Sequence, residues 1–218
     1  MAKKKTITSN DIISFYMDYV LEHGKQPKTV YAFAKANNFE EQKFYDYYGS
    51  FEAVEKNIFK VFFDNTHHAL EQNEDYLSFD ARNKLLSFYF TFFENLTANR
   101  SYVIYALEQH KKSLKGLQLL SELKSAFTTY IEHLDIELIE IKQEQFDKIQ
   151  RRGLKESAWL QLLLTMKFWI DDTSAGFEKT DIFIEKSVNT TFDVLDVAPI
   201  KSLIDFGKFI FKEKIHMN

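Results

Sequence analysis

Apolar residues recur at helical spacing through most of the 218-residue chain, at i, i+3 and i+4 with polar positions between them. This pattern predicts amphipathic helices over residues 9–23, 50–74, 78–98, 101–110, 156–170 and 178–197, and a mostly helical stretch over 111–150. We expect that stretch to kink near Asp135 and to end at Arg151, Arg152 and Gly153, because cations followed by glycine favour a helix C-terminus. Two prolines and six glycines leave few breaks, so the chain is predicted to be all-α.

Two shorter helices are predicted between residues 28 and 54. Val30 and Phe33 begin an apolar helical face that is interrupted near Asn38, since asparagine tolerates the left-handed conformation that ends helices. A second short helix follows over 40–49, and a serine then caps the helix after it. Two helices around a short turn, the second short and exposed, form a helix-turn-helix.

The run AKANNFEEQKFYDYYGSFEAV, which starts at Ala34, resembles the DNA-binding signature of TetR-family regulators. The residues that match by identity or by type are Phe33, Ala34, Phe39, Phe44, Tyr45, Tyr47, Tyr48, Ser50, Glu52 and Val54. The resemblance implies a TetR-like all-α fold with a three-helix head, residues 1–52, that binds DNA. It also implies a helical body, residues 53–218, for ligand binding and dimerisation.

The resemblance further implies a transcriptional regulator that binds a double-stranded DNA operator as a homodimer. Its recognition helices would lie about 34 Å apart, one turn of DNA. The implied DNA contacts are Lys43 and Tyr45, with Lys28, Thr29 and Tyr47 on phosphates. The segment carries three lysines, at 28, 35 and 43, against four acids, at 40, 41, 46 and 52, and the whole chain has a net charge of −4. Acids on a recognition helix oppose the phosphate contacts that supply most non-specific affinity.

The predicted helix over 78–98 is apolar around nearly its whole circumference, which indicates burial. Its aromatic side chains either pack in the core or line a cavity for a hydrophobic small molecule or lipid. The candidate ligand-binding residues are Phe88, Tyr89, Phe92, Phe93, Tyr105, Phe127, Trp159 and Leu163. Such a ligand would release or retain the DNA-bound dimer. The helices over 156–170 and 178–197 either pack in the core or form a four-helix dimer interface.

A second resemblance involves the run FWIDDTSAGFEKTDIFIE, which starts at Phe168. It is similar to the lipid-binding accessory proteins of coenzyme Q biosynthesis, with Asp181 where those proteins carry a tryptophan. The shared residues are Trp169, Asp172, Ser174, Phe177, Thr180 and Phe183. The alternative function that this implies is a lipid-binding accessory protein that has the same fold and does not bind DNA. Residues 199–214 are predicted to form a basic amphipathic helix, which either packs on the body or on a partner, or makes a peripheral membrane contact.

Other chemistry has little support in the sequence. The chain lacks cysteine, the G-x-S-x-G and H-E-x-x-H motifs and a glycine-rich phosphate loop, so we expect no enzyme, cofactor or metal site. His67 and His68 point about 100° apart on a helix and cannot chelate one ion. No apolar run is long enough to span a membrane and no signal peptide is present, so a cytoplasmic location is expected. The basic residues 2–5 are either a solvated tail or a DNA-contacting arm.

Overall fold

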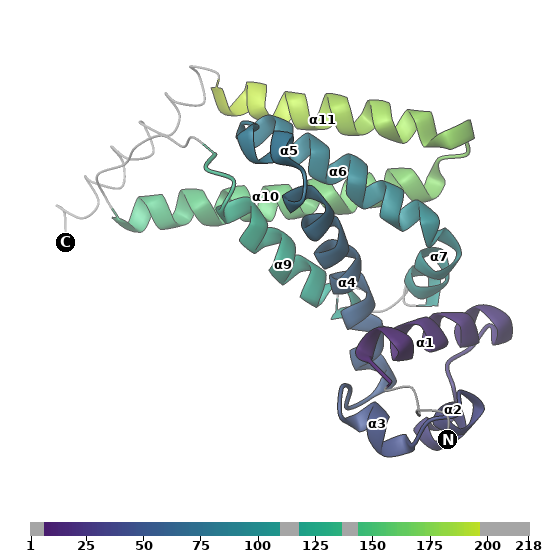
Figure 1. Ribbon diagram of the computed structural model, residues 1–218. Coiled ribbons are helices and arrows are strands. Elements are labelled where there is room, and N and C mark those ends of the chain that lie inside the picture. Colours follow the sequence, from purple (N-terminus) through teal and green to yellow (C-terminus); the bar gives the residue numbers. More distant parts are fainter. Residues whose placement is uncertain (1–6, 110–117, 137–143, 197–218) are drawn as a thin grey trace, which may run out of the picture. The chain divides into compact units, whose positions relative to one another are not determined.

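The computed structural model describes residues 7–109, 118–136 and 144–196, and every regular element in these ranges is helical (Figure 1). The helices are α1 (Ser9–His23), α2 (Val30–Ala36), α3 (Glu41–Tyr45), α4 (Phe51–Glu71), α5 (Glu74–Ser78), α6 (Ala81–Ala98), α7 (Arg100–Gln109), α9 (Ser121–Glu132), α10 (Glu144–Asp171), the 3-10 helix η1 (Ala175–Phe177) and α11 (Glu178–Asp196). The all-α prediction is confirmed for these residues. The basic arm at residues 2–5 and the amphipathic segment 199–214 lie outside them.

The boundaries of α1 follow from local chemistry. The backbone N–H of Thr8 donates to Asp11 Oδ2 at 2.9 Å, and the N–H of Asp11 donates to Thr8 Oγ1 at 3.2 Å, which is a capping box. At the other end Gly24 takes a φ of 64° and donates its N–H to the carbonyl oxygen of Val20 at 2.9 Å. Glycine adopts this left-handed conformation without a Cβ clash, so the chain can turn there.

Two sequence predictions near the middle of the chain had different outcomes. The break near Asp135 is present: α9 ends at Glu132, and Asp135 has a φ of 49°. The stop predicted at Arg151, Arg152 and Gly153 is wrong, because α10 continues through these residues to Asp171. A glycine inside a helix costs only about 1 kcal/mol, which the rest of a long helix offsets.

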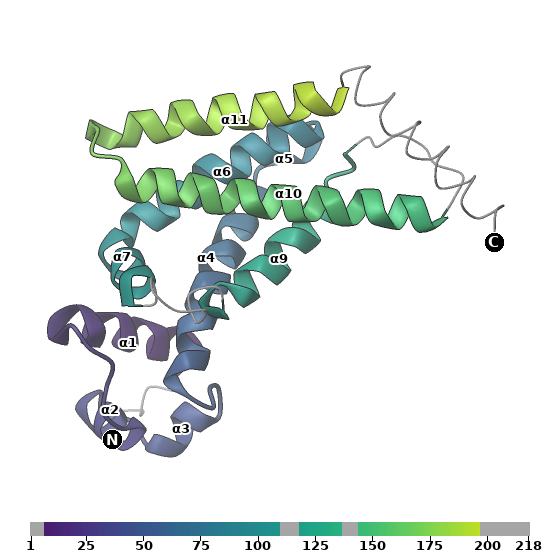
Figure 2. The same cartoon turned by 180° about the vertical axis from the view of Figure 1, so that it is seen from behind.

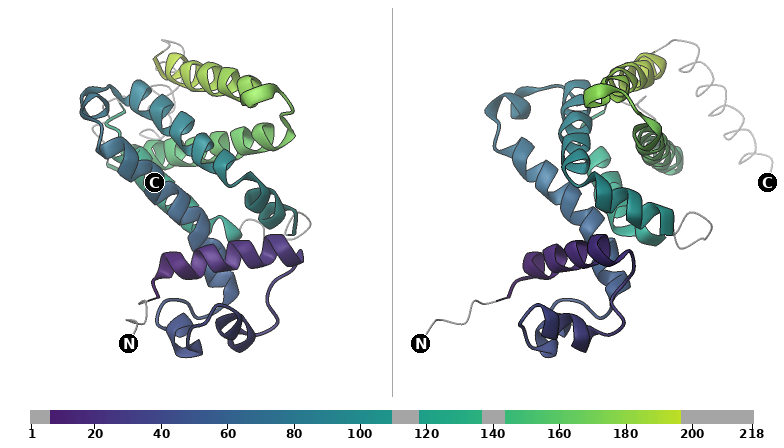
Figure 3. Two further views of the ribbon diagram at one scale, coloured as in Figure 1. Left: turned by 45° about the vertical axis from the view of Figure 1, so that its right-hand side comes forward. Right: turned by 90° about the vertical axis from the view of Figure 1, so that its right-hand side faces the viewer.

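The chain divides into two compact units. Unit 1 comprises Met1–Thr66 and Phe92–Ala126, and unit 2 comprises His67–Thr91 and Phe127–Asn218. In unit 1 the helices α1, α2 and α3 form a head, and α2 and α3 lie beside each other in both views of Figure 3. The core of the head is aromatic. The buried ring of Phe33 meets five others edge-on, at centroid distances between 5.4 and 6.4 Å: Tyr16, Tyr19, Phe39, Phe44 and Phe51.

In unit 2 the helices α10 and α11 pack side by side, as Figures 1 and 2 show from opposite directions. The rings of Phe168 and Phe183 stack between them at 4.6 Å, and Gln161 bonds Thr191 at 3.1 Å. Arg82 of α6 donates to Asp193 of α11 at 2.8 Å. These contacts fix the α10–α11 pair within unit 2. The division predicted at residue 52 stays a prediction.

Candidate nucleic-acid interface and ligand-binding residues

The turn between α2 and α3 has the chemistry that the sequence predicts. The side-chain amide of Asn37 donates to the carbonyl oxygen of Phe33 at 2.9 Å, and Asn38 takes a left-handed φ of 56°. Phe39 then inserts its buried ring against Phe33 and donates its N–H to the carbonyl oxygen of Ala34 at 3.0 Å. The turn is therefore closed by hydrogen bonds and by an aromatic contact, which sets α3 firmly against α2.

The five residues predicted to contact DNA are all exposed on this head: Lys28, Thr29, Lys43, Tyr45 and Tyr47. The side chains of Tyr45 and Tyr47 are 53% and 46% exposed, whereas the neighbouring Phe44 and Tyr48 are buried. Thr29 caps α2, because its hydroxyl oxygen accepts the N–H of Ala32 at 3.1 Å. Its own proton remains available to a phosphate oxygen.

Two further exposed residues on α2 were not among the predicted contacts. Tyr31 is 60% exposed, and Lys35 places its ammonium group 6.0 Å from the centroid of the Tyr31 ring. Tyr31 lies two positions before the buried Phe33, and Lys35 lies one position after the buried Ala34. Helical periodicity alone could therefore have identified both as outward-facing. They add one cation and one aromatic ring to the same head.

The lysines of the head differ in their surroundings. Lys43 Nζ lies 2.7 Å from Asp46 Oδ2, and the hydrogen bond and charge of Asp46 raise the pKa of Lys43 above its usual range. Among the residues that the structure describes, Lys28 and Lys35 have no acidic partner within 4.0 Å. The cation on α3 is therefore paired with an acid, whereas Lys28, which precedes α2, and Lys35, which lies on α2, are not.

Tyr47 also joins the head to the beginning of the described chain. Its hydroxyl donates to the carbonyl oxygen of Ile7 at 3.2 Å. Ile7, two positions after the basic arm, is thus held next to the segment after α3. The arm itself lies outside the described residues.

The predicted ligand-binding residues fall into three groups. Phe88, Tyr89 and Phe127 belong to unit 2 and are completely buried, with Phe88 and Phe127 5.4 Å apart and Tyr89 and Phe127 6.4 Å apart. Phe92 and Phe93, which are buried, belong to unit 1 together with the partly exposed Tyr105. Trp159 and Leu163 lie on α10 in unit 2, the first buried and the second partly exposed.

Sequence reasoning missed Tyr130 as a member of the first group. Its ring lies 4.9 Å from that of Phe88, and its hydroxyl donates to the carbonyl oxygen of Lys84 at 3.1 Å. The hydroxyls of Tyr130 and Tyr76 lie 3.0 Å apart. Burial raises the pKa of Tyr130 far above its usual range, so the ring stays neutral and acts as a packed hydrogen-bonding group.

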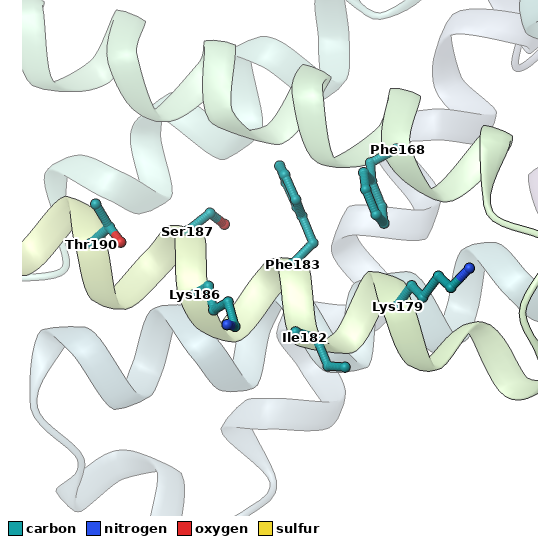
Figure 4. Close-up of a pocket in the computed structure, with 7 residues that line it drawn as sticks. All are labelled: Phe168, Lys179, Ile182, Phe183, Lys186, Ser187 and Thr190. Carbon is teal, nitrogen blue, oxygen red and sulfur yellow. The ribbon is translucent and has the colours of Figure 1, made fainter.

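An apolar groove of about 610 Å³ lies along α10 and α11 in unit 2. Figure 4 shows the rings of Phe168 and Phe183 facing each other between the two helices, with Ile182 on the outer side of α11. The full lining is Phe168, Lys179, Ile182, Phe183, Lys186, Ser187 and Thr190. Leu160 and Leu164 precede Phe168 on the same stripe of α10 and are 56% and 52% exposed, while Ile182 is 51% exposed. We call the groove together with these exposed leucine and isoleucine side chains the α10–α11 face.

The second sequence motif forms the turn between α10 and α11. Asp172 Oδ1 accepts the N–H of Ser174 at 2.8 Å and its hydroxyl at 2.7 Å, and Oδ2 accepts the same two groups of Thr180 at 2.9 and 2.7 Å. Desolvation raises the pKa of Asp172, but these four hydrogen bonds outweigh it and hold the pKa well below its usual range. The shared residues thus have a structural role here. The lipid-binding function that the motif implies stays a prediction.

Within the described ranges, no group of three or more His, Asp or Glu side chains is placed to hold a metal ion. In the same part of the chain, no helix combines the length and the hydropathy that a membrane crossing needs. Residues 84–210, more than half of the chain, match the family model described as "Tetracyclin repressor-like, C-terminal domain". A search of curated proteins gives no match.

Proposed function

Because the chain belongs to the tetracyclin repressor-like (TetR) family, we propose that it is a transcriptional regulator that binds operator DNA as a homodimer and responds to a hydrophobic ligand. The observation that carries the proposal is the head, in which a closed turn sets α3 against α2 and five predicted contact residues are exposed. A small helical head with exposed tyrosines and lysines matches the chemistry of groove and phosphate contacts.

On DNA, α3 would lie in the major groove while α2 crosses the backbone, as in other helix-turn-helix proteins. Lys43 and Tyr45 lie on α3 and would meet base edges and adjacent phosphates. Lys28 and Thr29, which come before α2, and Tyr47, which comes after α3, would contact phosphates. In this arrangement the phosphate contacts position the head, and α3 reads the sequence.

The homodimer is supported by the α10–α11 face. Half-exposed leucine and isoleucine side chains on two adjacent helices form an apolar surface of the kind that marks an interaction site. Two copies related by a two-fold axis would bury the same face on both subunits and form a four-helix bundle. Such a dimer binds two half-sites about one DNA turn apart, because that spacing presents both recognition helices to the same side of the duplex.

The ligand part of the proposal rests on the family and on the aromatic residues of α6, α7, α9 and α10. An apolar molecule regulates DNA binding only if it binds the DNA-binding conformation of the dimer with a different affinity from a conformation in which the two heads do not fit the operator. The partly exposed members of the predicted set are Tyr105 in unit 1 and Leu163 in unit 2, and each is a position in its own unit that an apolar molecule could reach without opening the core. Mass spectrometry of an organic extract of the purified protein tests this part, with a co-purified apolar molecule as the expected result.

DNA binding is tested by fluorescence anisotropy with a labelled duplex from the region upstream of the protein's own gene, and with a scrambled duplex. We expect tighter, salt-sensitive binding to the upstream duplex, weakened by Tyr45→Ala and by Lys43→Ala. Lys60→Ala is the matched control, since Lys60 is an exposed lysine on α4 that pairs with Asp64 outside the head. Equal binding to both duplexes, or none, would refute the proposed function.

A further inference from the structure

Two consecutive hydrogen bonds join the segment after α3 to α9 through one side chain of α4. The hydroxyl of Tyr48 donates to Asn57 Oδ1 at 2.8 Å, and the side-chain nitrogen of Asn57 donates to Glu122 Oε2 at 3.3 Å. The three residues come from separate segments of the sequence and all belong to unit 1. An asparagine amide has one acceptor and two donors, so it can bond both neighbours at the same time.

The tyrosine of this pair of bonds is held firmly. Tyr48 is 7% exposed, and its ring lies 6.1 Å from that of the buried Phe44. Burial first, and then the charge of Glu122, raises the pKa of Tyr48, while a hydrogen bond with Ser9 lowers it. The hydroxyl therefore keeps its proton at neutral pH and remains a donor to Asn57.

Tyr48 is also bonded to the end of α3. The backbone N–H groups of Tyr47 and Tyr48 both donate to the carbonyl oxygen of Phe44, at 3.1 and 2.9 Å. With only five residues, α3 is too short to be stable as an isolated helix, so its order depends on contacts of this kind. The position of Tyr48 is thus coupled to that of α3 and of Tyr47, a predicted phosphate contact.

Asn57 lies at the edge of the buried stripe of α4. Val54, three positions before it, is completely buried, and Val61, four positions after it, is partly exposed. A polar side chain next to a buried stripe is favourable only if it is hydrogen-bonded, and both ends of the Asn57 amide are. A leucine at this position would extend the apolar stripe, so packing alone does not require an asparagine here.

We propose that Asn57 is a positioning residue for DNA binding: it holds Tyr48, and through Tyr48 the recognition helix α3, in a fixed position relative to Glu122 of α9. Operator affinity then depends on a carboxylate that lies outside the head and is not a predicted DNA contact. The link to operator affinity rests on the proposed function, whereas the link between Glu122 and α3 does not.

Hydrogen exchange measured by mass spectrometry on the full-length protein tests the second link without DNA. We expect Glu122→Ala and Tyr48→Phe each to speed the exchange of amides in residues 41–48 by about three- to tenfold, the usual worth of one hydrogen bond. In an Asn57→Leu background, which lacks the connecting amide, Glu122→Ala should cause no further increase. Asn65→Ala is the matched control, because Asn65 is an exposed asparagine on the same helix, and it should leave this exchange unchanged.

Operator affinity is the readout that a purely structural role of Asn57 would not change. We expect Asn57→Leu to keep the midpoint of thermal unfolding close to that of wild type and to weaken binding to the upstream duplex by about three- to tenfold per subunit. Glu122→Ala should weaken this binding in the wild-type background and not in the Asn57→Leu background. A protein that binds DNA equally well with asparagine or leucine at position 57 would overturn the proposal.

Two outcomes of the exchange measurement would also overturn it: unchanged exchange of residues 41–48 in Glu122→Ala, or an equal increase with and without the Asn57 amide. If Glu122→Ala does not fold, Tyr48→Phe gives the same comparison, because the increase that it causes should be smaller in Asn57→Leu than in wild type. A wild-type protein that binds no DNA would refute the proposed function, and the exchange measurement would still decide whether Glu122 acts on α3 through Asn57.

Discussion

The ion pair between Lys43 and Asp46 gives a sharp test of the candidate recognition helix. Lys43 Nζ lies 2.7 Å from Asp46 Oδ2, and both side chains are about half exposed. In this state the cation is held by a carboxylate of its own helix end and not by a phosphate. Asp46→Asn keeps the size of the side chain and removes the charge, so it frees Lys43 and, in the proposed complex, removes an acid close to the DNA.

The expected size of the effect follows from counterion release. Each lysine that neutralises a phosphate steepens the dependence of log K on log salt by about 0.9, so two subunits contribute about 1.8. Between 50 and 200 mM salt the logarithm of concentration changes by about 0.6, which corresponds to roughly a tenfold additional loss of affinity across this range. The Asp46→Asn protein should therefore bind more tightly than wild type at low salt and lose that advantage as salt rises.

The assay is anisotropy with the upstream duplex at four or more salt concentrations. Asp64→Asn is the control, because it breaks a matched pair with Lys60 on α4, away from the head. Lys43→Ala in the Asp46→Asn background should abolish the added slope. An Asp46→Asn slope that Lys43→Ala does not lower would show that Lys43 does not reach a phosphate, and the assignment of that residue would be withdrawn.

Three further predictions concern the body and the head. Leu164→Glu should raise the dissociation constant of the dimer, measured by sedimentation velocity, by at least about 30-fold. The half-exposed Leu164 of each subunit would lose burial worth about 1 kcal/mol and be replaced by a charge; an unchanged dissociation constant would place the interface elsewhere. Asp172→Asn should lower the midpoint of thermal unfolding at neutral pH. Because the pKa of Asp172 is lowered in the folded state, its contribution is present above about pH 4 and is lost as pH falls through the folded pKa, so the difference from wild type should shrink in acid. Gly24→Ala should lower the free energy of unfolding by about 1 kcal/mol in urea titrations, because Gly24 has a φ of 64°, while Gly49→Ala should change it little.

The local features of the head could be predicted from sequence because each depends on neighbouring residues. Gly24 ends α1, Asn38 takes the left-handed conformation after α2, and Ser50 Oγ accepts the N–H of Ala53 at 3.3 Å at the start of α4. Each of these signals involves residues at most four positions apart. The same kind of signal failed at Gly153, where end signals were present but the helix continued. Local chemistry permits a helix to end, and packing over the whole helix decides whether it does.

The long-range contacts of the site could not be predicted in this way. Tyr16 and Glu55 are 39 positions apart, and nothing in the spacing of 11 tyrosines indicates which one meets a buried carboxylate. The pairing of Lys43 with Asp46 depends on how α3 ends, since Asp46 is the residue that caps it. The count of charged residues shows that the segment over 28–54 is acidic, but it does not show that Lys43 is the lysine paired with an acid.

The aromatic residues of α6 show why a periodic pattern leaves core and cavity unresolved. A helix that is apolar on all sides must be enclosed, and α6 contributes Phe88 and Tyr89 to unit 2 and Phe92 and Phe93 to unit 1. A side chain that lines a cavity large enough for water keeps accessible surface there, and Phe88, Tyr89 and Phe92 have none. Their apolar character is thus already accounted for by packing. A ligand therefore has to contact residues that keep accessible surface, or it has to displace the side chains that are packed in the core. Substitutions at Tyr105 and Leu163 would separate lost ligand binding from a damaged core, whereas substitutions at Phe88 would not.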